Sequence, residues 1–373
     1  MAAAAAAAAR ARGALWAALI GDALSMPVHW YYDTSAIDRD FGEIRGYRAP
    51  KEVHPTSIMH CSSTGGGGRG TAGGQVVGKV ILHDKAEFWG GKNRGIHYHR
   101  GMQAGENTLT SRCARILLRT IAEAGGVYEE DRFLEDYVKF MTTPGTHNDT
   151  YADSFHREFF LRFGQGLPPR KCVGPEMSDT AQIGGLVMLI PVITSVTLSS
   201  VKGKEELTAD EKNDAVTAAE DAAVRQLRLT HNSEKLERNA KTYARMLSST
   251  LLGDDLRAVI DSNESALGLP MGPLVERGLD DRQVAGGIFG IACYIDDALR
   301  VVAYLSHKYA EAPAEGLFAN TRCGGENCQR GACVGALLGA ANGYDSLPSP
   351  LVNGLHAAAT VRTEVEAFLA AHK

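Results

Sequence analysis

One helix-like segment near the end of the chain constrains the fold more than any other feature. In "NTRCGGENCQRGACVGALLGAANG" (residues 320–343), Gly331, Gly335 and Gly339 recur at every fourth position. A glycine inside a helix costs about 1 kcal/mol relative to alanine, so three at one spacing need a reason. The spacing places them on one helix face, where a second backbone can come very close. The segment therefore predicts a buried helix.

Helical patterns dominate the rest of the chain, and few stretches alternate with a period of two. We expect helices at 12–30, 107–126, 131–141, 149–163, 179–198, 208–230, 233–251, 284–310, 328–341 and 355–371. The helix at 107–126 has Asn107 or Thr108 as its N-cap and Gly125-Gly126 as its stop. These patterns predict a mainly α-helical protein.

Composition and charge limit the classes of partner. The chain has 373 residues, of which 44% are hydrophobic and 22% charged, with a formal net charge of −5. A weakly negative protein lacks the basic face through which nucleic acids are bound. No block of 18 or more apolar residues is present. We therefore expect no nucleic-acid partner and no membrane partner.

The opening "MAAAAAAAARAR" is low-complexity alanine. We expect residues 1–11 to form a disordered tract before a single domain at 12–373. An organellar transit peptide is the alternative, because the segment contains arginines and no acidic residue, although it is short for such a peptide.

Seven cysteines form no disulfide-like framework, and their number is odd. Cys323, Cys328 and Cys333 recur every five residues, which matches no zinc-ligand spacing. We expect them to behave as small buried hydrophobes in a reducing compartment. This indicates an intracellular protein, with the cytoplasm as its expected location.

A Gly-Glu-Asn tripeptide occurs twice, in "GENT" (105–108) and "GGEN" (324–327), each time at the expected start of a buried helix. If the two helix ends converge, Glu106, Glu326, Asn107 and Asn327 meet in one pocket. Such a pocket can hold a cation, orient a water molecule or bind sugar hydroxyls. The alternative is that each asparagine only caps its helix, which is worth about 1 kcal/mol. The repetition favours a shared site.

A third polar cluster lies in "TTPGTHNDTYADSFHREF" (142–159), where His147, Asp149 and Tyr151 stand close together. An imidazole beside a carboxylate can titrate near neutrality and act as an acid or a base. The alternative is a capping aspartate with solvated polar neighbours. We expect His147 or Asp149 to be the proton donor or acceptor of a reaction.

These segments, together with "GALWAALIGDALSMPVHW" (13–30), resemble the ADP-ribosylglycohydrolase family, which includes dinitrogenase-reductase-activating glycohydrolase and the jellyfish J1 crystallins. The opening is similar to the family's Gly-Asp-Ala-Leu signature, at Asp22. The final helix is similar to its Gly-Gly-Asp-Thr-Asp-Thr motif, followed by Gly-Ala-Leu-Leu-Gly-Ala. The resemblance implies an all-α, compact single-domain orthogonal helical bundle with a central cleft. It also implies hydrolysis at C1″ of ADP-ribose, assisted by two magnesium ions.

The metal motifs depart from the family pattern. The ligand positions that the resemblance implies align with 105–108 and 326–329, where only Glu106 and Glu326 keep a carboxylate. Two others become Asn107 and Cys328. Magnesium prefers hard oxygen ligands, and cysteine is a poor member of such a set. We expect one magnesium ion held by Glu106 and Glu326, or none, and no organic cofactor.

The resulting hypothesis is a monomeric hydrolase of an N- or O-glycosidic bond in an ADP-ribosyl or related ribosyl substrate. Glu106 and Glu326 would position water, and Asn107 and Asn327 would bind ribose hydroxyls. The further expected substrate contacts are Asp22, Thr108, Tyr151, Ser178, Gly324 and Gly325. Two alternatives remain: a non-catalytic binding or structural protein, as the J1 crystallins suggest, and an enzyme for a smaller nucleoside or sugar.

Overall fold

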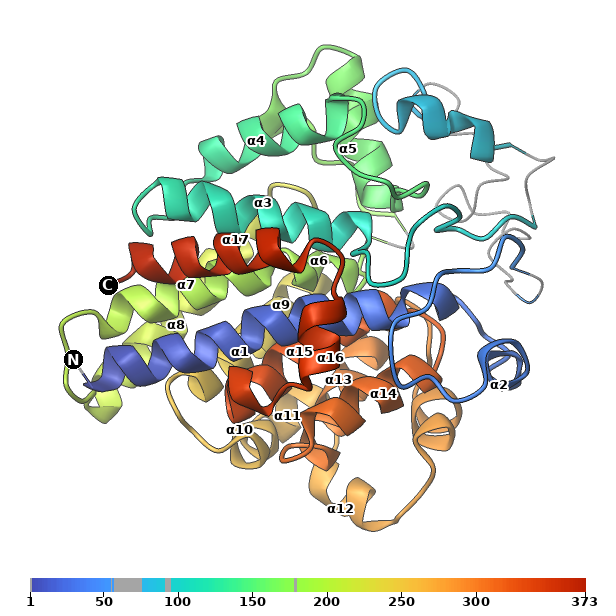
Figure 1. Cartoon of the computed structure of the whole chain (residues 1–373). Coiled ribbons are helices and arrows are strands. Elements are labelled where there is room, and N and C mark those ends of the chain that lie inside the picture. The colour runs from blue at the N-terminus through green and yellow to red at the C-terminus, as the bar shows by residue number, and fades with distance from the viewer. Residues whose placement is uncertain (1, 55, 57–75, 91–94, 178–179) are drawn as a thin grey trace.

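The computed structural model describes residues 2–54, 56, 76–90, 95–177 and 180–373, and Figure 1 shows their arrangement. Within these residues the regular structure is helical, with three isolated β-bridges and no strand. The all-α prediction is confirmed. The α-helices are α1 (Ala2–Ser25), α2 (Ser35–Phe41), α3 (Leu109–Glu123), α4 (Glu130–Thr142), α5 (Ser154–Gly164), α6 (Gly184–Val187), α7 (Leu189–Val201), α8 (Ala209–Leu227), α9 (Glu234–Leu251), α10 (Leu256–Ser262), α11 (Glu264–Leu267), α12 (Met271–Glu276), α13 (Ile295–Lys308), α14 (Pro313–Arg322), α15 (Asn327–Asn342), α16 (Ser349–Gly354) and α17 (Ala358–Ala371).

The glycine-rich helix α15 packs directly on α1, as its spacing predicts. A Cβ atom on Gly335 would lie 2.1 Å from the carbonyl oxygen of Ala17, and one on Gly339 would lie 2.2 Å from that of Gly13. Gly331 faces Gly21 in the same way, at 2.6 Å. The first helix of the chain is therefore held against a helix from its last fifth, with backbone against backbone.

The alanine-rich start belongs to this core. The expectation of a disordered tract is wrong for residues 2–11, because α1 begins at Ala2. Ala7 is 1% exposed and Ala11 is fully buried. Alanine has the highest helix propensity, and its small side chain allows close packing. The segments Ala3–Val28 and Gly184–Val201 are long and apolar enough to cross a membrane by length and composition alone, but 56% of an 18-residue stretch of the first and 83% of the second are buried inside the protein.

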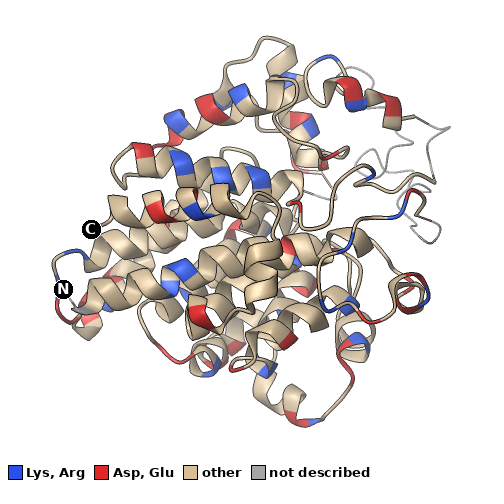
Figure 2. Ribbon diagram, in the orientation of Figure 1, with Lys and Arg blue, Asp and Glu red and all other residues tan. Residues whose placement is uncertain are grey.

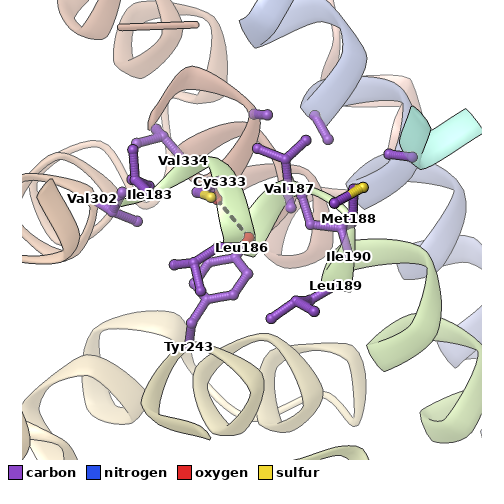
Figure 3. Close-up of a cluster of buried hydrophobic side chains, with 14 of the residues drawn as sticks. Ile183, Leu186, Val187, Met188, Leu189, Ile190, Tyr243, Val302, Cys333 and Val334 are labelled. Carbon is purple, nitrogen blue, oxygen red and sulfur yellow. Dashed lines mark hydrogen bonds between the residues drawn. The ribbon is translucent and has the colours of Figure 1, made fainter. Parts of the chain in front are cut away.

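The other helices surround the α1–α15 pair. Helices α7, α8 and α9 pack against one another on one side, α13 and α14 contact α15, and α3 lies beside α17 (Figure 1). Figure 3 shows the core between α6, α7, α9 and α15, where the Tyr243 hydroxyl donates a 3.1 Å hydrogen bond to the carbonyl of Cys333. Cys323 and Cys333 are fully buried, as expected for small hydrophobes.

Three expected helices begin later or break. The segment 149–163 becomes α5, which begins only at Ser154, with Asp153 as its N-cap. The segment 179–198 becomes α6 and α7, which are joined at Met188. The segment 284–310 contains a short π-helix, η6 (Gln283–Ile288), then an irregular stretch, and α13 begins only at Ile295. Gly286, Gly287 and Gly290 explain this interruption, because glycine disfavours a continuous helix.

Candidate functional site

The start of α3 borders a hollow of about 320 Å³, which we call the Glu106 hollow. Residues from four parts of the chain line it, and their side chains are mostly polar or charged. They are Lys85, Met102, Glu106, Asn107, Arg112, Arg115, Gly145, Thr146, His147, Asn148 and His356. The hollow therefore brings together Glu106, Asn107 and His147, three of the residues that the sequence predicts.

Glu106 is held by one carboxylate oxygen. Its Oε2 accepts hydrogen bonds from the backbone N–H of Gln103 at 2.6 Å and from Asn148 Nδ2 at 3.1 Å. Its Oε1 lies 3.9 Å from His356 Nδ1, which is longer than a hydrogen bond. The side chain is 12% exposed. One oxygen thus fixes the carboxylate, and the other stays available to a ligand.

His147 supplies a neutral imidazole to the same hollow. Burial lowers the pKa of His147 to about 4, so the ring is uncharged at neutral pH. Its Nδ1 is buried and has no hydrogen-bond partner among the described residues. A neutral ring of this kind can accept a proton or orient a water molecule.

Helix α3 adds positive charge to the hollow, and its basic positions are visible in Figure 2. Arg112 and Arg115 line the hollow together with Lys85, against the single carboxylate of Glu106. The Arg115 guanidinium also donates a 2.7 Å hydrogen bond to Glu364, so its charge is partly balanced. An excess of guanidinium and ammonium groups suits an anionic ligand such as a phosphate group.

Two buried carboxylates from elsewhere hold the first turn of α3. Asp22 accepts hydrogen bonds from the backbone N–H and the hydroxyl of Thr108, at 2.9 and 2.6 Å, and from Asn107 Nδ2 at 3.0 Å. Asp149 accepts from the backbone N–H of Leu109 at 2.8 Å. They satisfy free N–H groups at the positive end of the helix dipole. Asp22 and Asp149 therefore fix the residues that form the wall of the hollow.

Glu326, His29, His99 and Asp149 form a hydrogen-bonded chain, which we call the buried relay. His29 Nε2 lies 2.6 Å from Glu326 Oε1, His29 Nδ1 lies 2.7 Å from His99 Nε2, and His99 Nδ1 lies 2.8 Å from Asp149 Oδ1. All four side chains are at most 2% exposed. Trp30, at a φ of 61° that is rare outside glycine, donates its indole N–H to Glu326 at 2.6 Å.

The two ends of the buried relay differ in acidity. Burial raises the pKa of Glu326 to about 7. Burial alone would also raise the pKa of Asp149, but the charge of His99 and its hydrogen bond hold that pKa below its usual value. Burial lowers the pKa of His29 well below its usual value. With a proton on Glu326, each group can donate to the next, and the chain ends on an ionised Asp149.

The expectation that Glu106 and Glu326 face one wet hollow is wrong. Glu326 is 1% exposed, does not line the Glu106 hollow, and uses both oxygens for His29 and Trp30. A magnesium ion held jointly by the two glutamates therefore does not fit these side chains. Among the described residues, Glu106 and Glu326 are connected only indirectly. The buried relay runs from Glu326 to Asp149, and Asn148, the neighbour of Asp149, donates a hydrogen bond to Glu106.

The remaining predicted residues near Glu326 pack inside the protein. Asn327 is fully buried and donates to the carbonyl of Thr321 at 3.1 Å. Gly324 and Gly325 have φ of 62°, and a Cβ on either would lie within 2.3 Å of a carbonyl oxygen, which explains both glycines. Tyr151 is 4% exposed. Its ring stacks on Trp89. Ser178 lies outside the described residues.

Sequence reasoning missed the two histidines of the relay. His29 lies after the short 3-10 helix η1 (Met26–Val28), and His99 lies in an irregular segment before α3. His29 falls at the end of the expected helix 12–30 and His99 in no periodic pattern, and a separation of 70 positions hides their contact. The local signal for His99 is the density of histidine in "IHYHRG" (96–101).

Comparison with known proteins agrees with this architecture. A family model described as ADP-ribosylglycohydrolase matches residues 3–372. The chain belongs to the ADP-ribosylglycohydrolase family. A solved structure titled "ADP-ribosylglycohydrolase-related protein complex" has the same fold, with a TM-score of 0.58, 18% sequence identity and 98% of each chain covered. The search of curated proteins found no match.

Membership of the ADP-ribosylglycohydrolase family confirms the resemblance carried by the Gly-Asp-Ala-Leu segment and the final helix. It also supports a glycohydrolase-type activity in general terms. At 18% identity the solved structure shows the fold alone.

Proposed function

We propose that this member of the ADP-ribosylglycohydrolase family hydrolyses the glycosidic bond of an ADP-ribosyl or related ribosyl substrate in the Glu106 hollow. The observation that carries the proposal is the meeting of a carboxylate with one unbonded oxygen, a neutral imidazole and an amide around one hollow. Cleavage of a glycosidic bond develops positive charge on the sugar ring, and a nearby carboxylate stabilises that charge.

Each side chain has a role that its geometry allows. Glu106 Oε1 positions water or faces the developing oxocarbenium ion. His147, neutral at pH 7, accepts the proton of the attacking water. Asn107 lines the hollow, and its buried Oδ1 atom has no hydrogen-bond partner among the described residues, so it can accept from a ribose hydroxyl once the side chain turns toward the hollow.

Glu326 and Asp149 act as positioning residues in this proposal. Asp149 holds the backbone of Leu109, and its neighbour Asn148 holds Glu106. Glu326 anchors the other end of the same hydrogen-bonded chain. Neither lines the hollow, so neither contacts the substrate directly.

The dimensions of the hollow favour a small part of the substrate. Its volume of about 320 Å³ is near the lower limit of ligand pockets. A ribosyl phosphate unit fits this space, with its phosphate near Lys85 and Arg112. A smaller nucleoside or sugar phosphate is therefore the second candidate substrate. The non-catalytic alternative predicts binding of the same ligands without turnover.

The test is a hydrolysis assay with N- and O-linked ADP-ribosyl substrates and with ribosyl phosphates, for wild type and Glu106→Gln. We expect the substitution to lower kcat/KM by a factor of about 100 or more, because it removes the charge that faces the sugar. The melting temperature should change little. Glu276→Gln, at an exposed glutamate of α12, is the matched control and should retain activity. Normal turnover by Glu106→Gln would exclude this site, and binding without hydrolysis by wild type would support the non-catalytic alternative.

A further inference from the structure

Three potential metal-ligating atoms meet behind the Glu106 hollow, although none of the three residues lies in a zinc-like sequence pattern. His29, His99 and Cys328 each offer one ligand atom, and these atoms lie within 4.8 Å of one another. His29 and His99 are 2% exposed, and Cys328 is fully buried. His29 follows η1, His99 precedes α3, and Cys328 lies in the first turn of α15. The fold alone therefore brings them together.

The two imidazole rings are oriented as metal-ligating histidines are. Their facing nitrogens, His29 Nδ1 and His99 Nε2, are 2.7 Å apart. The opposite nitrogen of each ring meets a carboxylate: His29 Nε2 with Glu326 at 2.6 Å, and His99 Nδ1 with Asp149 at 2.8 Å. A carboxylate that accepts the outer N–H fixes the ring and its tautomer, and it raises the basicity of the inner nitrogen. Both inner nitrogens can then present lone pairs to one cation.

We propose that His29 Nδ1, His99 Nε2 and the Cys328 thiolate bind a Zn²⁺ ion. Two imidazoles and one thiolate form a borderline-soft ligand set that suits zinc and does not suit magnesium. Binding releases two protons: the thiol proton of Cys328, so that the sulfur coordinates as a thiolate, and one proton from the Glu326–His29 pair, so that Glu326 is ionised and His29 Nδ1 is free to bind the ion. Glu326 and Asp149 accept hydrogen bonds from the ligating rings and do not themselves contact the ion.

The two histidines need only a small adjustment to hold zinc. Zinc–nitrogen bonds of about 2.0–2.1 Å in a tetrahedral array place two nitrogens roughly 3.3 Å apart. The His29 and His99 nitrogens must therefore separate by roughly 0.6 Å from their 2.7 Å contact. This is a small rotation of two side chains, and it replaces one hydrogen bond with two metal–ligand bonds.

Met102 links the proposed zinc site with the Glu106 hollow. It forms a small buried cluster with Cys328 and Met26, and it also lines the hollow. Methionine is unbranched and flexible, so movement of its side chain gives an ion a path inward from the hollow. The zinc proposal does not depend on the proposed hydrolysis, because its readout is the binding of a metal.

The experiment is a titration of the full-length, metal-free protein with Co²⁺, which reports thiolate coordination through a sulfur-to-cobalt charge-transfer band. We expect saturation at one equivalent, displacement of Co²⁺ by Zn²⁺, and no displacement by Mg²⁺. Cys328→Ala should abolish the band. Cys333→Ala is the matched control, since Cys333 is also fully buried on α15, and it should keep the band.

Two results of the titration would contradict the proposed zinc site. No band in the folded wild-type protein, or a band that persists in Cys328→Ala, would overturn the proposal. If Cys328→Ala does not fold, Cys328→Ser replaces it, and the melting temperature of wild type with Zn²⁺ decides the question. We expect one equivalent of Zn²⁺ to raise that temperature, and an unchanged value overturns the proposal. Each of these readouts stands whether or not glycosidic hydrolysis is found.

Discussion

At the scale of single residues, burial decides how much an ion pair contributes to the stability of the folded protein. Helix α17 carries two glutamates, two positions apart, that form ion pairs. Glu364 binds Arg115 and the more exposed Arg119, and Glu366 binds Arg12. Glu364 is 8% exposed and meets the buried Arg115, whereas Glu366 is 46% exposed and meets Arg12 at the surface. Removing one partner of a buried pair leaves an uncompensated charge, but removing one partner of an exposed pair leaves a solvated one.

We expect Glu364→Ala to lower the free energy of unfolding by about 3–5 kcal/mol, because Arg115 then stays buried without its carboxylate. The matched variant Glu366→Ala should cost less than about 1 kcal/mol. Both substitutions change the same residue type in the same helix, so differences in helix propensity cancel. Urea denaturation measures both values, and equal losses would contradict the argument.

The same scale shows the limits of reading site residues from sequence. The pair of Gly-Glu-Asn tripeptides correctly marks two helix starts, at Thr108 and Glu326. It does not reveal that Glu106 borders solvent while Glu326 is sealed behind His29 and Trp30. Exposure depends on the irregular segments that cover each helix end. No periodic pattern encodes those segments.

At the scale of helices, the contact between α1 and α15 is the feature best predicted from sequence. A regular spacing of glycines is a local pattern that predicts close packing of two helices, and the structure shows this packing. The structure of the alanine-rich start is harder to predict from sequence, because low complexity is typical both of disordered tails and of closely packed helices. What distinguishes the two is burial, and burial depends on the partners of Ala7 and Ala11 far along the chain.

We expect Gly335→Ala to destabilise the protein by about 1–3 kcal/mol, the usual cost of overpacking a core. The added methyl group would lie 2.1 Å from the Ala17 carbonyl oxygen, and the two helices would have to separate. We expect this loss of stability although alanine is a better helix former than glycine by about 1 kcal/mol.

Gly46→Ala is the control for that variant. Gly46 has no neighbour within 4 Å of an added Cβ, so thermal unfolding should be nearly unchanged. A Gly335→Ala protein as stable as wild type would show that the backbone contact is looser than the structure indicates.

At the scale of the whole molecule, buried carboxyl groups make the stability depend on pH. Burial, together with the nearby Glu326 carboxylate, raises the pKa of Asp153 to about 7. At a pH between the unfolded and the folded pKa, such a carboxyl is protonated in the folded protein and ionised in the unfolded chain. Its contribution to stability is therefore complete below the unfolded pKa and is lost as the pH rises through about 7.

We expect Asp153→Asn to gain stability relative to wild type between pH 5 and pH 8. The amide oxygen can still accept from Thr110 and Gln329, both of which lie 2.8 Å from the Asp153 carboxylate, and the amide never ionises. Denaturant unfolding at several pH values measures the difference. A difference that is constant with pH would show that Asp153 is ionised throughout this range.

The chain order of the central contact has a consequence for synthesis. Helix α1 ends at Ser25, and its partner α15 begins at Asn327. A ribosome adding about 5–20 residues per second needs roughly 15–60 s to pass from one to the other. During that interval the nascent chain presents an apolar helix without its partner, so its production in the cell should depend on chaperones that bind emerging segments.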